Sequence, residues 1–265
     1  MTDDLNAIFF PDLAAQVDPR AAARASVARV LPRRFYKEAA SQLSEGMHVL
    51  VLDGRPARTP AKSPLALPTA EAAALVVREW NAQGDEIDPA TMPATRLVNA
   101  AIDGVRVHAE GVAAEIAGYG ASDLLCYRAA DPQRLFDRQA AAWDPVLDWA
   151  HEALGARFVL AEGVMFVAQP AAATAAVERA VQGFADSFGL ACLSTMTSLT
   201  GSVLLALAVA HGRLSTAEAW AAAHVDEDFQ MEVWGQDEEA LERRARRWAE
   251  MQAAADLLHT TRAAG

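Results

Sequence analysis

The spacing of apolar and polar residues predicts a small β-rich region near the start of the chain. Residues 33–39 and residues 47–52 are both predicted strands, and the second runs into Asp53-Gly54, a dipeptide typical of tight hairpin turns. Four prolines follow between residues 56 and 68. Proline lacks the backbone N–H that a central strand donates, so we expect an edge strand or a loop after the turn.

Further along the chain the apolar spacing changes to three or four residues, which is the period of a helix. Thr69 fits the N-cap of a helix that ends near Gly84, and helical spacing resumes from Leu97 to about Tyr119. These helices follow the β-rich region closely. We therefore expect them to belong to the same domain as the β-rich region.

The second half of the chain is predicted to be mainly helical. One helix should end near Trp143, because Asp144-Pro145 can begin another: a proline in the first turn loses no helical hydrogen bond. Residues 157–169 are a second candidate strand. Four further helices are expected, separated by Gly189, Gly212 and Gly235, over 171–188, 191–211, 215–233 and 237–262. The helix over 191–211 is apolar on all sides, as in the centre of a bundle.

Together these elements predict an α+β fold, with a small β-rich N-terminal domain followed by a larger, mainly α-helical C-terminal domain. We expect an irregular or partly helical lead-in over residues 1–30, a β-rich domain with associated helices over 31–125, and a mainly helical domain over 126–265. The longest apolar stretch, Val203 to Ala210, is far shorter than the ~20 residues that span a bilayer. Stable membrane insertion is therefore not expected.

The charge of the chain argues against several kinds of partner. Its 23 Lys and Arg residues against 35 Asp and Glu residues give a net charge of −12 at pH 7. Nucleic acids and anionic membranes are bound through basic faces that meet phosphate groups, so we expect neither as a partner. The acidic start of the chain resembles no signal or transit peptide, and two cysteines cannot form a disulfide framework. These features favour a cytoplasmic protein.

Sequence motifs for catalysis or metal binding are not found. His151-Glu152 lacks the second histidine of a zinc-protease helix, and Gly118-Tyr-Gly120 lacks the third glycine of a dinucleotide loop. The six histidines are scattered without the spacing of metal ligands. We therefore expect no catalytic residue, no cofactor and no metal. An enzyme nevertheless stays an alternative, because active sites can assemble from distant positions.

One acidic and aromatic segment, residues 226–239, stands out with seven acids and no basic residue. The acids at 237–239 suit the positive N-terminal end of the last helix, whereas those at 226–228 have no such explanation. Periodicity alone favours the simpler interpretation, in which the apolar members are core and the acids are solvated. Four side chains of the segment share one helical stripe, at i, i+3, i+4 and i+7: Glu227, Gln230, Met231 and Trp234.

An ordered series of short motifs extends over most of the chain, from about residue 33 to residue 250: Phe35-Tyr36, Asp53-Gly54-Arg55-Pro56-Ala57-Arg58-Thr59-Pro60, Glu79-Trp80, Trp143-Asp144-Pro145, Trp149-Ala150, Glu227-x-x-Gln230 and Trp234-Gly235. This series resembles the assembly chaperones of the F₁-ATPase α subunit, which occur in α-proteobacteria and in mitochondria. The missing transit peptide fits a cytoplasmic bacterial member, whereas eukaryotic relatives would reside in the mitochondrial matrix.

The resemblance implies a protein that is not an enzyme. It would bind the unassembled ATP synthase α subunit, shield its assembly surface until the β subunit replaces the chaperone, and so promote assembly of the F₁ head. It implies the same α+β fold and no use of nucleotide or metal. It also implies a functional acid late in the helical part, which we match to Glu227, although Asp226 and Asp228 flank it. We expect a monomer with a partner-binding site formed by Glu227, Gln230, Trp234, Asp226 and Met231.

Two alternatives stay open. The chain could be a hydrolase or transferase that uses a carboxylate pair in the 226–239 segment, because neighbouring acids can raise one another's pKa for general-acid work. It could also be a generic protein-interaction scaffold unrelated to ATP synthase. A deep polar pocket around Glu227 would favour an enzyme, whereas a broad exposed apolar surface would favour a chaperone.

Overall fold

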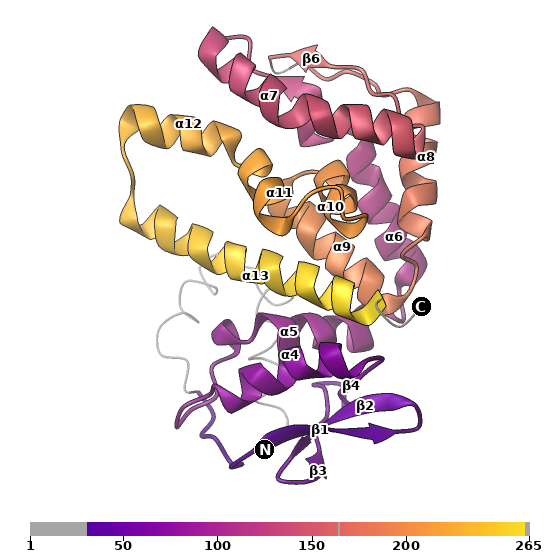
Figure 1. Ribbon diagram of the computed structural model, residues 1–265, viewed down its shortest axis with the longest axis vertical. Helices are drawn as coiled ribbons and strands as arrows, with labels where there is room; N and C mark the ends of the chain where they lie inside the picture. Colours follow the sequence, from indigo (N-terminus) through magenta and orange to yellow (C-terminus); the bar gives the residue numbers. More distant parts are fainter. Residues whose placement is uncertain (1–30, 164, 263–265) are drawn as a thin grey trace, which may run out of the picture. The chain divides into compact units, whose positions relative to one another are not determined.

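The computed structural model describes residues 31–163 and 165–262, and the expected lead-in over 1–30 lies outside them. The described residues form two compact units. We call residues 31–104 with 260–262 the β unit, and residues 105–259 the helical unit. The α+β fold class is confirmed, with a small N-terminal sheet followed by a larger helical part (Figure 1). The domain boundaries expected from the sequence stay predictions, since compactness alone does not show that a segment folds independently.

A four-stranded antiparallel sheet organises the β unit. Strand β2 is central: it pairs along its whole length with β1, and on its other edge with β3 and β4. The predicted hairpin at Asp53-Gly54 is confirmed, with positive φ angles of 48° and 77° that such a turn requires. The four strands are β1 (Ala39–Ser44), β2 (Met47–Leu52), β3 (Arg55–Pro56) and β4 (Ala66–Leu67).

Helix α4 (Ala70–Asn81) packs against β1 and β2. Thr69 caps its first turn by accepting a hydrogen bond from the Ala72 amide, as predicted, and its hydroxyl donates to the Thr260 carbonyl at 2.8 Å. The Glu79 side chain extends from α4 to the start of α5 (Pro93–Ala100). Its carboxylate accepts hydrogen bonds from the Ala94 and Thr95 amides at 2.7 Å each and so caps the first turn of α5. Burial raises the pKa of Glu79, although these hydrogen bonds oppose the shift.

The strand predicted over 33–39 is wrong, because side chains take the backbone groups that a neighbouring strand would need. The Arg34 guanidinium donates to the carbonyls of Tyr36, Lys37 and Gln83. The Asp53 carboxylate accepts the amides of Lys37 and Glu38, which lowers the pKa of Asp53. The first strand therefore begins only at Ala39.

The helical unit contains eight longer helices within its described residues, with the last, α13, reaching beyond it (Figure 1). Helices α9 and α10 form its centre: the residues from Val203 to Val209 are all fully buried, which confirms the predicted apolar core. Gly201 separates the two with a φ of +69°, so the single helix expected over 191–211 is two. The helices are α6 (Ala109–Gly118), α7 (Gln133–Trp149), α8 (Ala171–Gln182), α9 (Ser187–Thr200), α10 (Val203–Ala210), α11 (Thr216–Ala223), α12 (Val225–Trp234) and α13 (Glu238–Arg262).

Two predictions for this unit are wrong. Helix α7 continues through Pro145, because Trp143 and Val146 are both buried beside it and outweigh the hydrogen bond that the proline removes. The strand expected over 157–169 is reduced to β6 (Ala161–Glu162), which pairs in parallel with β5 (Tyr127–Arg128). The Gln169 side chain takes both backbone groups of Val159, at 2.8 and 2.9 Å, in place of a partner strand.

Trp80 joins α4 to the segment that precedes the sheet. Its ring lies 5.5 Å from that of Tyr36, whose hydroxyl donates to the Trp80 carbonyl at 2.7 Å. Both side chains are buried. Replacing a buried tryptophan by alanine costs about 3–5 kcal/mol. We expect Trp80→Ala to unfold the β unit, as measured by urea denaturation followed by circular dichroism, and an unchanged unfolding midpoint would contradict this structural role.

Asp123 is fully buried where α10 begins. It accepts hydrogen bonds from the Ser202 hydroxyl at 2.7 Å and from the Leu125 and Leu204 amides. Burial raises the pKa of Asp123 to about 6, against 3.8 for an ordinary aspartate. The folded chain therefore binds more protons than the unfolded chain between about pH 4 and pH 6, and this group stabilises the fold more as the pH falls through that window.

We expect this effect to be on the order of 2–3 kcal/mol, because a tenfold change in proton affinity corresponds to about 1.4 kcal/mol. The free energy of unfolding, measured with urea at several pH values, should show it as a difference in pH dependence between the wild type and Asp123→Asn. Parallel curves for the two proteins from pH 4 to pH 6 would contradict the assignment.

Candidate functional site

A groove lies between helices α12 and α13, which are joined by a short loop at Gly235 (Figure 1). Gly235 ends α12 with a φ of +91°, a conformation that other residues rarely adopt. The volume of the groove is about 410 Å³. Its lining residues come from both helices and the loop: Glu227, Gln230, Met231, Trp234, Gly235, Asp237, Ala240, Leu241, Arg243, Arg244 and Arg247.

Polar contacts to α7 hold one side of α12. Glu232 accepts hydrogen bonds from Arg134 at 3.0 Å and from Arg138 at 2.8 Å, and the bond to Arg138 is bidentate. The guanidinium groups of both arginines also lie over the ring of Phe229, at 5.7 and 5.4 Å from its centre. The hydrogen bonds and charges of the arginines lower the pKa of Glu232.

Two further acids of α12 also have partners. Asp226 accepts a hydrogen bond from the buried Gln139 at 2.6 Å, and Gln139 in turn accepts the Ala129 amide. Asp228 forms an ion pair with Arg244 of α13. The acids at 226, 228 and 232 therefore position α12 on its neighbours. This is the structural explanation that the sequence alone does not provide.

Glu227 differs from these acids. Its side chain is 58% exposed and, within the described residues, forms an ion pair with no arginine or lysine. The Nε2 atom of His224 lies 3.7 Å from the carboxylate, but burial lowers the pKa of His224. The Nδ1 atom of His224 lies 2.7 Å from the Trp220 carbonyl, which can only accept, so the proton of the neutral ring is on Nδ1. Glu227 thus keeps an open carboxylate at the groove.

Exposed apolar side chains line the same groove as this carboxylate. Trp234 is 86% exposed and Leu241 is 38% exposed. Met231 is half-buried and lines the groove. The simpler interpretation, in which Trp234 belongs to the core, is therefore wrong. A tryptophan held in solvent at the end of a helix is typical of a binding surface rather than of packing.

The structure brings four of the five predicted site residues together: Glu227, Gln230, Met231 and Trp234 line one groove. The fifth, Asp226, points away to Gln139. The assignment of these residues to partner binding stays a prediction.

Sequence reasoning missed the α13 side of the groove, residues 240–247. Its arginines resemble an ordinary solvated helix face, with Glu239/Arg243 and Glu242/Arg246 spaced at i,i+4 in the sequence. In the structure Glu239 and Arg243 form an ion pair at 2.6 Å.

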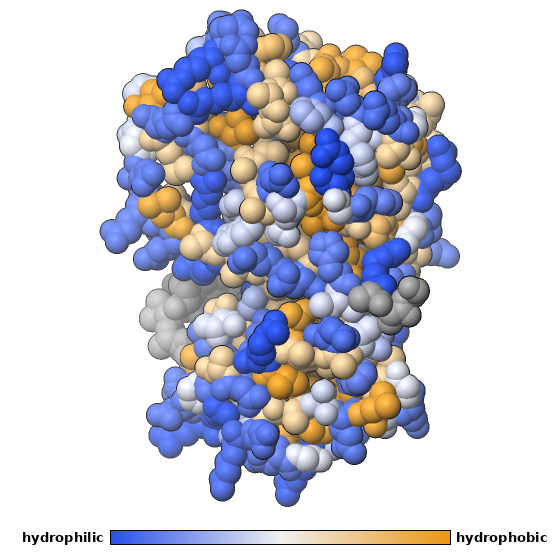
Figure 2. Space-filling view, in the orientation of Figure 1, coloured by the Kyte–Doolittle hydropathy of each residue, from blue (hydrophilic) through white to orange (hydrophobic). Residues whose placement is uncertain are grey.

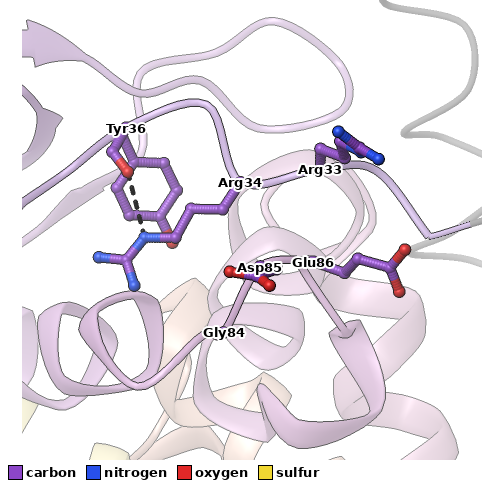
Figure 3. A pocket seen from close by; sticks show the side chains of 6 residues that line it. All are labelled: Arg33, Arg34, Tyr36, Gly84, Asp85 and Glu86. Atoms are coloured by element: carbon purple, nitrogen blue, oxygen red, sulfur yellow. Dashed lines mark hydrogen bonds between the residues drawn. The ribbon is translucent and has the colours of Figure 1, made fainter.

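A larger pocket of about 750 Å³ lies in the β unit, lined by Arg33, Arg34, Tyr36, Gly84, Asp85 and Glu86. Figure 3 shows that the Arg34 guanidinium turns back toward Tyr36. Asp85 and Glu86 lie on a second segment of the chain, on the other side of the pocket. The Arg34 charge is engaged with backbone carbonyls. The Arg34 side chain therefore stabilises the backbone of this segment. This makes the pocket a weaker candidate for a binding site than the groove.

The described residues contain no group of three or more His, Cys, Asp or Glu side chains that could hold a metal ion. None of the helices in the same residues is long and apolar enough to cross a membrane. Figure 2 shows that exposed apolar residues on the visible face form small patches between hydrophilic ones. The groove combines a charged group, the open carboxylate of Glu227, with exposed aromatic and aliphatic side chains. Surfaces that bind other proteins commonly combine apolar and charged groups in this way.

Comparison with known proteins agrees with a protein that binds other proteins. The family described as ATP12 chaperone protein matches residues 33–151. A putative chaperone from Agrobacterium tumefaciens, of known crystal structure, is 48% identical over 97% of this chain and 96% of its own, with a TM-score of 0.85. The crystal structure of Atp12 from Paracoccus denitrificans is 41% identical over 87% of this chain and 99% of its own, with a TM-score of 0.80.

The fold and the comparisons define the class: this is a chaperone. The chain belongs to the ATP12 chaperone family, which is the family of ATP synthase assembly chaperones that its sequence motifs resemble. The resemblance seen in the sequence is thereby confirmed.

Two tryptophans of the helical unit differ sharply in burial, one in the core and one at the groove. Trp143 is 1% exposed and donates to the Ala222 carbonyl at 2.7 Å, whereas Trp234 is 86% exposed. We expect Trp143→Ala to lower the free energy of unfolding by about 3–5 kcal/mol, and Trp234→Ala to change it by less than about 0.5 kcal/mol. Urea denaturation of both variants measures the contrast. A strongly destabilised Trp234→Ala would show that this indole is part of the packing.

Proposed function

We propose that this chain binds the unassembled α subunit of ATP synthase and shields its assembly surface until the β subunit replaces the chaperone. In this proposal the chain acts as a monomer in the bacterial cytoplasm and promotes formation of the F₁ head without catalysis. Membership of the ATP12 family supports the role in assembly. The identity of the α subunit as client is our inference from the motifs.

The open Glu227 carboxylate beside Trp234 is the observation that carries the proposal. An isolated assembly subunit exposes apolar surface and charged groups that its neighbours would cover. Trp234 can cover the apolar part, because an exposed indole buries a large area at low entropic cost. Glu227 can pair with an arginine or lysine of the client, since no arginine or lysine within the described residues forms an ion pair with it.

The alternative of a carboxylate-pair enzyme is weakened, because three of the seven acids in the segment are held by structural contacts. Asp226 is bonded to Gln139, Asp228 to Arg244 and Glu232 to two arginines, so these carboxylates have structural partners. The groove is also open and shared between acids and exposed apolar side chains rather than deep and polar. We therefore propose no reaction for this segment.

The test compares Glu227→Gln with Glu242→Gln. Both changes remove one exposed carboxylate from the same region, but Glu242 does not line the groove. We expect Glu227→Gln to weaken binding to purified α subunit about tenfold, which corresponds to one charged contact of roughly 1.4 kcal/mol, and to suppress its aggregation less well. Glu242→Gln should behave as the wild type. Binding is measured by surface plasmon resonance and aggregation by light scattering.

Equal affinities for the two variants would remove Glu227 from the site. Failure of the wild-type protein to bind α subunit at all would overturn the proposed client. Since the two changes are matched in charge, a general effect of net charge would weaken both variants alike.

A further inference from the structure

The β unit contains a second pocket, of about 590 Å³, that the groove does not explain. Its floor is apolar and aromatic: Leu52, Trp80 and Ile87 are buried, while Phe35 is 68% exposed at its edge. Three exposed basic residues, Arg55, Arg58 and Lys62, also line it. We call this the basic pocket.

The three cations are open for a partner. Within the described residues, none of Arg55, Arg58 and Lys62 forms an ion pair. The one acid of the pocket, Asp53, uses its carboxylate to accept the amides of Lys37 and Glu38. The lining therefore carries three positive charges against one negative charge, on a chain whose net charge is −12. Such a concentration attracts a negatively charged group.

The loop that carries Arg58 and Lys62 is held in place, and Arg55 lies in strand β3. Asp103 accepts hydrogen bonds from the Thr59 hydroxyl at 2.7 Å and from the Ala61 amide at 3.0 Å. Thr59 and Lys62 close a tight turn, in which Lys62 has a φ of +68°, and the Arg58 guanidinium donates to the Lys62 carbonyl at 2.8 Å. The basic side chains are thus presented on a fixed backbone, which lowers the entropic cost of binding.

A carboxylate is the group that best matches this pocket. Its oxygens accept charge-assisted hydrogen bonds from arginine and lysine side chains. The buried apolar floor favours an apolar neighbour beside that acid.

We propose that the basic pocket is a second client-binding site, which takes a peptide segment with an acidic side chain next to an aromatic or aliphatic one. The acid meets Arg55, Arg58 and Lys62, and its apolar neighbour packs on Phe35. Nucleic acid does not fit, because three cations in one pocket do not form the continuous basic face that a phosphate backbone requires. The inference rests on the proposed function, since it presupposes a protein client.

A peptide titration tests the pocket without the α subunit. The probe is a fluorescein-labelled peptide Ala-Asp-Phe-Glu-Leu-Ala with a blocked C-terminus, and its control replaces both acids by lysine. Fluorescence anisotropy with the full chain should show binding of the acidic peptide, weakened by salt, and no binding of the lysine peptide. Equal binding of both peptides would overturn the proposal.

Variants then locate the site. We expect the double variant Arg55→Glu with Arg58→Glu to weaken binding of the acidic peptide about tenfold or more, since it replaces two attractions by repulsions. Arg78→Glu is the control for a single charge reversal, as in Lys62→Glu, because Arg78 is exposed in the β unit but does not line the pocket. Lys62→Glu provides an independent variant if the double variant does not fold. Unchanged affinity in a folded variant, or full displacement by inorganic phosphate, would overturn the peptide site.

The two binding measurements distinguish a failure of this inference from a failure of the proposed function. If wild-type protein binds α subunit but the acidic peptide does not bind, the pocket proposal fails and the α12–α13 groove stands. If the peptide binds at the pocket but α subunit is not bound, the proposed client fails while the pocket stands as a peptide site.

Discussion

Helix α12 depends on a small set of charged contacts, because none of its side chains is buried. Most helices of globular proteins are held by an apolar face, which contributes about 25 cal/mol for each Å² removed from water. In α12 that contribution is largely replaced by Glu232 between two arginines, by Asp228 with Arg244, and by the arginine contacts to the Phe229 ring. These contacts fix the position of the helix while leaving its other face in solvent.

This arrangement explains how one short segment can be both ordered and available. An apolar helix face that is exposed for a partner normally seeks burial in its own protein. Here the acids facing α7 and α13 orient α12 so that Trp234 stays exposed and Glu227 stays open at the groove. Exposed ion pairs are individually weak, but a bidentate arginine pair within a network has better geometry than an isolated one. The groove side of α12 is thus ordered by contacts within the chain itself.

Much of the fold could be predicted from the sequence, because its determinants are local. The Asp53-Gly54 turn, the Thr69 cap and the stripe from Glu227 to Trp234 each depend on a few adjacent residues. The roles of the acids could not be predicted, since Arg138 lies 94 residues from Glu232 in the chain. At Pro145 the local sequence predicts a helix boundary, but tertiary contacts override it, because buried neighbours keep α7 continuous.

The two candidate sites lie in different units and offer different charged groups to a partner. The groove offers a carboxylate with exposed apolar side chains, whereas the basic pocket offers three cations around an aromatic floor. Under both proposals, a client held at one site would meet the other at a raised effective concentration, so two weak contacts would reinforce each other. A competing subunit would displace such contacts one at a time. A chaperone that must yield its client during assembly therefore gains from distributing the binding free energy over two separate surfaces rather than concentrating it in a single tight one.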